Sequence, residues 1–310
     1  MEEILKPHSL DDSMIASIGF FDGVHTAHQA LLKRTIELAK AENKTPVVIT
    51  FDRHPKSVIF DMDFRYITPL DKKIALLKGY GIAHVFVLPF DKPLSEIPAE
   101  TFIKDYLAGV HTLVCGFDFR FGHGGKGTTE LLKENADFNV HIMDEIRWVD
   151  QKIGSTLIRE LIQAGKMQQV HHHLGRYFSI RGEVIHGEKK GRLIGYPTAN
   201  IELSNVVTPK RGVYASITRI ADTLHHSMTS VGHNPTLNAS HPLSVESYVF
   251  DFDQMIYGST ITTYFVAWLR DEQKFDSVKD LIRQIDADAV ASKKVLNPLN
   301  LSLPSHEFML

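Results

Sequence analysis

Short apolar runs alternate with amphipathic stretches along the first half of the chain. The apolar runs predict buried strands at Ile15–Phe20, Pro46–Phe51, His84–Leu88 and Thr112–Cys115. Apolar residues at helical spacing predict helices over His28–Ala41, Leu70–Gly79, Ala99–Leu107, Thr129–Glu134 and Ser155–Ala164. Strands and helices in repeated alternation predict an α/β fold with a parallel sheet and crossover helices. Ligands of such sheets bind at the carboxyl ends of the strands, so the loops that follow the strands are the candidate sites.

The pattern changes after about residue 175. Alternating β-branched and aromatic residues predict strands at Ser179–His186, Val213–Ile220, Leu224–Val231, Val245–Phe252 and Thr260–Trp268, as in an antiparallel sheet or small barrel. One amphipathic helix, Val278–Val295, follows them. We therefore expect two domains, residues 1–170 and 171–310, with the boundary in the stretch 166–178. The histidine run His171–His173 lies in this stretch, where we expect a solvated junction.

Composition excludes several classes of protein. The 310 residues include 34 basic and 37 acidic ones, and the net charge of −3 does not favour a non-specific nucleic-acid binder. The single Cys115 forms no internal disulfide and excludes a Cys-rich zinc module. The N-terminus is acidic where a signal peptide is basic, and no run approaches the ~20 apolar residues of a membrane span. We expect a soluble, cytoplasmic protein.

The segment Ile18–His28 carries the first candidate site, because it leads from a predicted strand into a predicted helix. His25 and His28 are three residues apart at the helix start, so both can face one ligand. The helix N-terminus adds free N–H groups and a positive dipole end, which suit a phosphate. Gly19 and Gly23 allow a tight turn and a close approach to the ligand.

Two further segments have simpler explanations as well as functional ones. In Ile153–Arg159, Ser155 is a candidate N-cap, and Ser155, Thr156 and Arg159 could also bind phosphate. In Gly116–Gly122, three aromatic residues alternate with Asp118 and Arg120. These aromatic residues could stack on a flat ring, or they could belong to the core.

The order and spacing of these segments resemble the nucleotidyltransferase half of the bacterial bifunctional riboflavin kinase/FAD synthetases. The strand-end segment Thr50-Phe-Asp-Arg-His-Pro55 extends the resemblance, since that family has a Thr-Phe…His-Pro motif there. The resemblance implies a Rossmann-like FMN adenylyltransferase domain. It places His25, His28, Ser155, Thr156 and Arg159 around the ATP phosphates. It also implies that the flavin and nucleotide contact Gly19, Phe20, Asp22, Gly23, Phe51, His54, Pro55, Asp118 and Arg120.

The second half resembles the flavokinase signature of the same family over Gly182–Asn200. Further matches follow in order at Gly212–Ala215, Asn234–Thr236, Val245–Glu246, Asp251–Phe252, Ile256–Gly258, Arg270 and Lys274–Phe275. The resemblance implies a small antiparallel β-barrel with one long helix, and riboflavin kinase activity.

Side-chain chemistry agrees with the roles that this resemblance implies. Glu246 would be the general base for the ribityl hydroxyl, and Thr198 and Asn200 would hold Mg²⁺, a cation that prefers oxygen ligands. Phosphoryl transfer needs mainly positioning and charge neutralisation. The remaining implied contacts with nucleotide and flavin are Gly182, Gly187, Gly191, Arg192, Pro197, Tyr257 and Arg270.

The chain departs from the family pattern in its first half. Ala27 replaces a glycine of the His-x-Gly-His motif, Gly154 stands where serine is usual, and GHGGKGTTELL lacks the usual arginine and aspartate. The main hypothesis is an enzyme that phosphorylates riboflavin to FMN with ATP and adenylylates FMN to FAD. One alternative is an enzyme with a single activity, the adenylyltransferase being the one lost. Another is a flavin-binding regulator without turnover.

Overall fold

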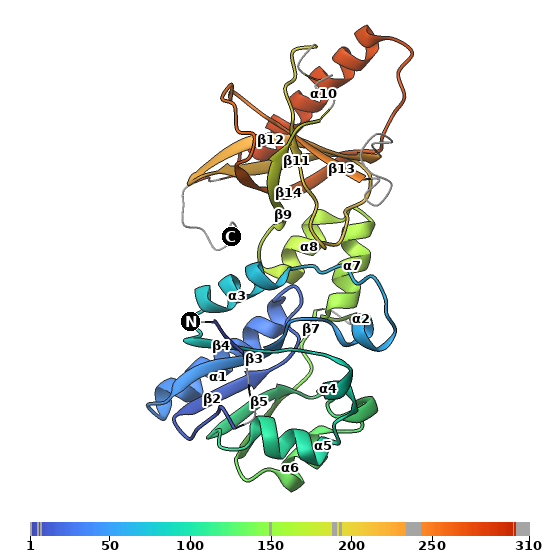
Figure 1. Ribbon diagram of the computed structural model, residues 1–310. Helices are drawn as coiled ribbons and strands as arrows, with labels where there is room; N and C mark the ends of the chain where they lie inside the picture. Colours follow the sequence, from blue (N-terminus) through green and yellow to red (C-terminus); the bar gives the residue numbers. More distant parts are fainter. Residues whose placement is uncertain are drawn as a thin grey trace. The chain divides into compact units, whose positions relative to one another are not determined.

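The computed structural model describes residues 2–4, 6, 8–148, 151–187, 191, 194–233, 243–299 and 301. The chain divides into two compact units, Met1–Ser155 and Thr156–Leu310 (Figure 1). The sequence predicted a boundary between two functional domains at residues 170 and 171. The two units are defined by compactness alone, so this functional boundary stays a prediction.

The first unit is built on a six-stranded parallel sheet with strand order β1-β4-β3-β2-β5-β6. Its strands are β1 (Glu2–Ile4), β2 (Met14–Ile18), β3 (Thr45–Phe51), β4 (His84–Leu88), β5 (Thr112–Gly116) and β6 (Asn139–Met143). The four inner strands confirm the prediction from apolar runs, because they are buried on both faces. The edge strands β1 and β6 were missed, since they are short or half-buried and carry polar residues.

Helices connect these strands. They are α1 (Thr26–Ala41), α2 (Pro55–Ile59), α3 (Leu70–Gly79), α4 (Lys92–Glu96), α5 (Ala99–Phe102) and α6 (Thr129–Asn135), with a π-helical turn η1 (Ile103–Leu107) and a 3₁₀ turn η2 (His123–Gly125). The predicted helix Ala99–Leu107 is α5 continued by η1. Strand order and crossovers therefore confirm the predicted α/β architecture.

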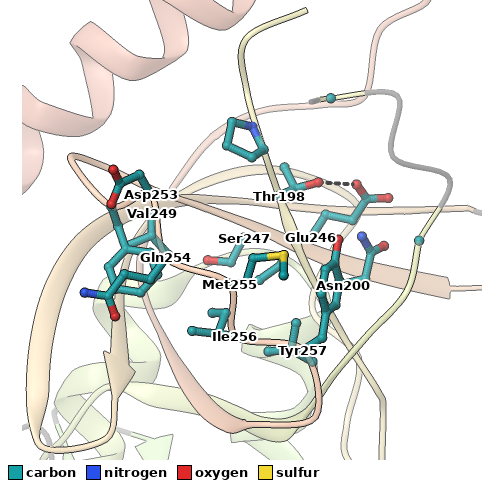
Figure 2. A pocket seen from close by; sticks show the side chains of 16 residues that line it. Thr198, Asn200, Glu246, Ser247, Val249, Asp253, Gln254, Met255, Ile256 and Tyr257 are labelled. Atoms are coloured by element: carbon teal, nitrogen blue, oxygen red, sulfur yellow. Dashed lines mark hydrogen bonds between the residues drawn. The ribbon is translucent and has the colours of Figure 1, made fainter. Parts of the chain in front are cut away.

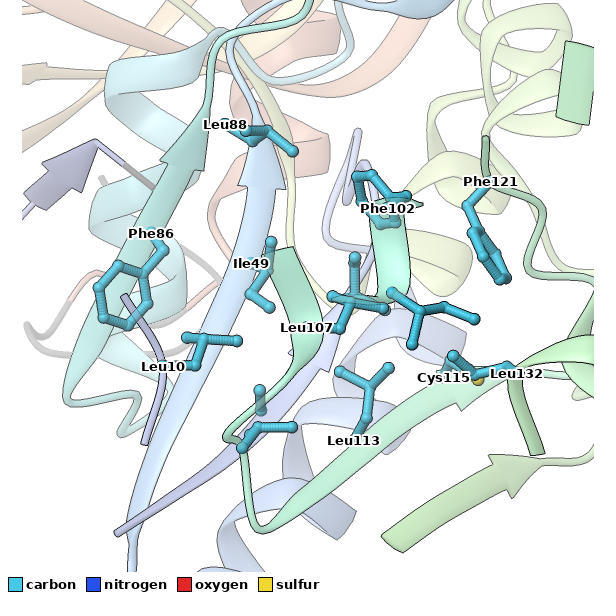
Figure 3. Packing of buried hydrophobic residues seen from close by; sticks show 14 of the residues in the cluster. Leu10, Ile49, Phe86, Leu88, Phe102, Leu107, Leu113, Cys115, Phe121 and Leu132 are labelled. Atoms are coloured by element: carbon cyan, nitrogen blue, oxygen red, sulfur yellow. The ribbon is translucent and has the colours of Figure 1, made fainter. Parts of the chain in front are cut away.

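One hydrophobic core of this unit lies between the sheet and α5, η1 and α6 (Figure 3). Leu113 and Cys115 of β5 pack there with Phe102, Leu107 and Phe121. The helices α1 and α3 also bury apolar residues, among them Leu32 and Leu77. Burial raises the pKa of the Cys115 thiol to about 12, so the thiol stays protonated at neutral pH and is a packing group.

The second unit contains a closed, antiparallel barrel with strand order β10-β13-β12-β11-β14-β9. Its strands are β9 (Phe178–Ile185), β10 (Ala199–Ile201), β11 (Gly212–Ile220), β12 (Thr223–His233), β13 (Leu243–Val249) and β14 (Thr260–Arg270). The helices are α7 (Ser155–Gln163), whose first residue belongs to the first unit, α8 (Met167–Leu174) and α10 (Val278–Leu296). Of the two predicted architectures, an antiparallel sheet and a small barrel, the barrel is correct. Two short antiparallel strands, β7 (Arg147–Trp148) and β8 (Gln151–Lys152), pair with each other in the first unit.

Buried hydroxyl groups form a network in the barrel. Thr218 Oγ1 hydrogen bonds with the hydroxyls of Ser227 and Ser247, both at 2.9 Å, and of Thr263 at 3.2 Å. Thr229 and Ser216 complete the network, and all six side chains are fully buried. Each hydroxyl is thus satisfied by another, as a buried polar group requires.

The histidine run lies in α8 and is not a solvated junction. Val170, His173 and Leu174 form the buried face of this helix, and only 1% of His173 is exposed. Burial and the neighbouring His172 lower the pKa of His173, so the imidazole is neutral at pH 7. The prediction was wrong because an i, i+3, i+4 apolar face includes the last histidine of the run.

None of the helices in the described part of the chain has the length and apolar character of a membrane span.

Candidate functional site

The loop after β2 brings the two predicted histidines together at the start of α1. His25 is the N-cap residue, and its Nδ1 accepts a hydrogen bond from the His28 backbone N at 3.3 Å. The two imidazole rings stack with centroids 3.6 Å apart and an interplanar angle of 15°. His25 is buried and His28 half-buried. The helix start thus presents two imidazoles beside the backbone N–H groups of its first turn, and His25 caps that of His28.

This loop has an unusual backbone. Phe21, Gly23 and Val24 have φ angles of 55°, 86° and 41°, in the left-handed region. Gly23 adopts this conformation at no steric cost. For Phe21 and the β-branched Val24 it costs about 1–3 kcal/mol each, which their complete burial offsets. Packing therefore holds the loop in a shape that the local sequence does not favour.

Asp22 connects this loop to two other segments. Its carboxylate accepts hydrogen bonds from the backbone N of Ile67 at 3.3 Å and of Thr68 at 3.0 Å. Its backbone oxygen accepts a hydrogen bond from Ser155 Oγ at 2.9 Å. Ser155 is the first residue of α7, so its prediction as N-cap was wrong. Its hydroxyl instead donates to the backbone carbonyl of Asp22, which lies 133 residues earlier in the chain.

The loop after β3 contributes aromatic rings. His54 is the N-cap of α2, and its Nδ1 accepts a hydrogen bond from the Lys56 backbone N at 3.1 Å. Its ring stacks on Phe64 with centroids 3.9 Å apart and meets Phe20 edge-on at 4.8 Å. Phe64 also contacts Tyr66. We call Phe20, His54, Phe64 and Tyr66 the aromatic cluster. Sequence reasoning missed Phe64 and Tyr66, because they lie in an irregular stretch without periodicity.

The loop after β5 offers one exposed ring, not three. Phe121 is buried in the core and stacks with Phe119 at 5.3 Å, so core packing is the correct interpretation for these two. Phe117 is 41% exposed, and Lys152 Nζ lies 4.9 Å from its ring centroid. Lys152 also pairs with the exposed Asp118. Arg120 is exposed on the same loop.

The remaining residues predicted for this site lie on either side of the start of α7. A Cβ atom at Gly154 would meet nothing within 4 Å, so the position has room for a side chain. Thr156 is exposed, and Arg159 is half-buried. Both belong to the second compact unit, and their place beside the histidine pair stays a prediction.

The barrel brings Thr198, Asn200 and Glu246 together. Asn200 of β10 is the direct antiparallel partner of Glu246 on β13, so their side chains lie on the same face of the barrel wall. Thr198 precedes β10, and its Oγ1 donates a hydrogen bond to Glu246 Oε2 at 3.1 Å. Figure 2 shows the three side chains on one side of a pocket. Asn200 Oδ1 is buried and accepts no hydrogen bond from the described residues.

Gly187 lies close to the side chain of Asn200. A Cβ atom at Gly187 would lie 2.3 Å from Asn200 Nδ2, so any larger residue there would displace this amide. Gly182 lies in β9, and Gly191 lines the pocket. Arg192 and the matching segment 234–236 lie outside the described residues.

Two cavities share a wall at Glu246. One has a volume of about 410 Å³ and is lined by Gly187, Pro197, Asn200, Asp253, Met255 and Tyr257. The other has a volume of about 320 Å³ and is lined by Tyr196, Tyr248, Arg270, Phe275, Leu281 and Ile285. Gly191, Thr198 and Glu246 line both cavities.

Two residues that line the second cavity make polar contacts with α10. Arg270 at the end of β14 binds Asp288 through Nη2 and Oδ2 at 2.6 Å and through Nε and Oδ1 at 2.9 Å. The Tyr196 hydroxyl donates a hydrogen bond to Asp286, and this contact raises the pKa of Tyr196 to about 12. Arg270 therefore binds a protein carboxylate here, and its predicted ligand contact would add to that role.

Comparison with known proteins identifies both units. The family model for FAD synthetase matches residues 8–157, and the model for riboflavin kinase matches residues 174–296. The chain belongs to the bifunctional riboflavin kinase/FMN adenylyltransferase family.

Relatives support this over nearly the full length. The enzyme of that name from Listeria monocytogenes is 36% identical over 285 residues, covering 90% of this chain and 91% of the relative. The one from Bacillus subtilis is 33% identical over 298 residues, covering 92% and 94%. A crystal structure named macrolide-efflux protein, from Streptococcus pneumoniae, superposes with a TM-score of 0.86 at 32% identity and covers 94% of this chain and 98% of that one.

These matches confirm the family resemblance, the fold and the main functional hypothesis. The protein is a transferase with two activities, riboflavin kinase and FMN adenylyltransferase. It uses ATP in both, to make FMN from riboflavin and FAD from FMN.

Proposed function

We propose that Glu246 is the general base of the kinase and that Thr198 and Asn200 hold Mg²⁺ beside it. The hydrogen bond between Thr198 and Glu246 carries this proposal, because it joins a hydroxyl and a carboxylate where two cavities meet. A carboxylate at such a junction can reach a proton on a substrate in one cavity while the phosphoryl donor occupies the other.

The donor atoms fit Mg²⁺. This cation prefers oxygen ligands, and Thr198 Oγ1 and the buried Asn200 Oδ1 are both neutral oxygens. Asn200 Oδ1 accepts no hydrogen bond from the described residues, and a buried acceptor of this kind calls for a cation or a donor. When bound, Mg²⁺ would neutralise charge on the ATP phosphates.

The two cavities suit the two substrates. Glycines border the first cavity, where backbone N–H groups can approach phosphates, so we assign it to ATP. The second cavity has aromatic walls from Tyr196, Tyr248 and Phe275, which suit the flat isoalloxazine ring of riboflavin. Glu246 takes the proton from the ribityl 5′-hydroxyl. The freed oxygen then forms a bond to the γ-phosphorus, and ADP leaves with the electrons of the broken P–O bond.

For the adenylyltransferase, we propose that His25 and His28 stabilise the ATP phosphates at the N-terminus of α1. A phosphate oxygen of FMN attacks the α-phosphorus of ATP, and pyrophosphate leaves. The stacked imidazoles lie at the N-terminus of a 16-residue helix, where the helix dipole stabilises negative charge. The aromatic cluster and Phe117 offer surfaces for the flavin ring.

One incubation tests these assignments. Purified protein is mixed with riboflavin, ATP and Mg²⁺, and riboflavin, FMN and FAD are separated by chromatography. We expect FMN first and FAD later. FMN without FAD, even with FMN supplied at high ATP, would support the single-activity alternative. Flavin binding without any product would support the regulator.

A further inference from the structure

Lys73 of α3 is a buried cation that no part of the mechanism above uses. Only 2% of this residue is exposed. Its Nζ donates hydrogen bonds to the backbone oxygens of Phe20 at 3.1 Å and Phe51 at 2.9 Å. The same Nζ lies 4.5 Å from the centroid of the Phe20 ring. Burying an ammonium is costly, so these contacts must compensate for lost hydration.

The two carbonyls lie at the start of the two loops that form the adenylyltransferase site. Phe20 lies in the loop that leads from β2 to His25, the N-cap of α1, and His28 follows in the first turn of that helix. Phe51 is the last residue of β3 and opens the loop that carries His54. Phe20 oxygen also accepts a hydrogen bond from Thr50 Oγ1 at 3.1 Å. Both loops are therefore tied together at the carboxyl edge of neighbouring parallel strands.

We propose that Lys73 is a positioning residue of the FMN adenylyltransferase, whose ammonium clamps the nucleotide loop after β2 to the flavin loop after β3. The ammonium also fixes the position of the Phe20 ring, which contacts the ring of His54 in the aromatic cluster. This inference rests on the proposed adenylyltransferase site. Because small displacements of bound reactants slow a reaction strongly, a fixed distance between these loops matters for catalysis.

The charge of Lys73 responds to pH near neutrality. Burial lowers the pKa of Lys73 to about 8, and the nearby carboxylates Asp22 and Asp52 oppose this shift. Asp22 is held by the backbone N–H groups of residues 67 and 68. Asp52 accepts a hydrogen bond from Phe90 N at 2.7 Å and lies 3.6 Å from Arg53 Nε. The ammonium is therefore intact below about pH 8, and the clamp weakens as the pH rises past that value.

The test replaces Lys73 with methionine, which keeps the apolar stem and removes the charge and the donors. The matched control is Lys78→Met, an exposed lysine on the same helix. We expect Lys73→Met to raise the KM for FMN in FAD formation by about tenfold or more. We also expect this KM to rise between pH 7 and 9 in wild type and to stay constant over this range in Lys73→Met. Lys78→Met keeps both wild-type properties, and FMN formation by the kinase is unchanged in both variants.

A purely structural lysine gives a different result. If Lys73→Met lowers the thermal midpoint and the amount of active enzyme but keeps the wild-type KM for FMN and its pH dependence, the proposal is wrong. Should Lys73→Met not fold, Lys73→Gln takes its place, and a wild-type KM for FMN in that variant overturns the proposal. A wild-type protein that makes no FAD at all would instead contradict the proposed function.

Discussion

Thr198 and Glu246 are 48 residues apart in the chain, yet a hydrogen bond of 3.1 Å joins Thr198 Oγ1 to Glu246 Oε2. Pairing of β10 with β13 creates this contact, since it sets Asn200 directly opposite Glu246. The barrel thereby gathers a hydroxyl, an amide and a carboxylate at the junction of two cavities.

Glu246→Gln should lower FMN formation by roughly 10²-fold or more, because glutamine cannot accept the substrate proton. Adenylylation of supplied FMN should stay near the wild-type rate, since Glu246 belongs to the other unit. Chromatographic separation of the flavins measures both rates in one preparation. Glu202→Gln, at an exposed position after β10, is the matched control. A normal kinase rate in Glu246→Gln would remove this carboxylate from the mechanism.

His28→Ala should reduce FAD formation from supplied FMN by roughly 10²-fold, the usual effect of losing one group that stabilises transition-state charge. FMN formation should be unaffected. His172→Ala removes an exposed imidazole on α8 and should change neither rate. Equal loss in both activities would indicate damage to folding and not to the adenylyltransferase site.

Ala27→Gly tests the departure from the family motif. Ala27 lies in the first turn of α1, so glycine should lower the free energy of unfolding by ~0.5–1 kcal/mol. We expect no change in the KM for ATP during FAD formation, because the dipole and N–H groups of the helix start are backbone features. Ala30→Gly, in the same helix, controls for the backbone effect. A lower KM for ATP in Ala27→Gly alone would show that the methyl group obstructs the nucleotide.

Thr218→Val should destabilise the barrel by about 1–3 kcal/mol, since it leaves buried hydroxyl partners without one hydrogen bond each. Those partners are Ser227, Ser247 and Thr263. Urea unfolding followed by circular dichroism measures the change. Thr223→Val, at an exposed position in β12, should be close to neutral. A neutral Thr218→Val would show that the network contributes no net stability.

A fragment of residues 166–301 should fold and phosphorylate riboflavin, because it contains the barrel, α10 and α8. A fragment that begins at residue 176 should have a lower urea midpoint. It lacks α8, whose residues Met167, Val170 and Leu174 are buried. Comparison of the two midpoints and of the FMN yields measures the contribution of α8. Equal midpoints would mean that the barrel is stable without this helix.

The sequence predicted the inner strands of the sheet, most of the longer helices and five of the six barrel strands, because their apolar periodicity is local. It also predicted the family, because short motifs keep their order along the chain. It missed β10, which has only three residues. Edge strands such as β6 were missed, since exposure on one side allows polar residues that conceal the period.

For the sites, the sequence by itself determined which side chains are available, including the His25–His28 pair at a helix start. Only the tertiary structure decided which of them meet. Burial separates Phe121, a core residue, from Phe117, an exposed one, although both belong to the same alternating segment. Lys73 belongs to none of the motifs found in the sequence. Its proposed role follows from the hydrogen bonds of its ammonium group to the backbone oxygens of Phe20 and Phe51, which the folded structure brings together. The physical reason is that strand pairing and burial depend on contacts between distant segments, which local residue patterns do not encode.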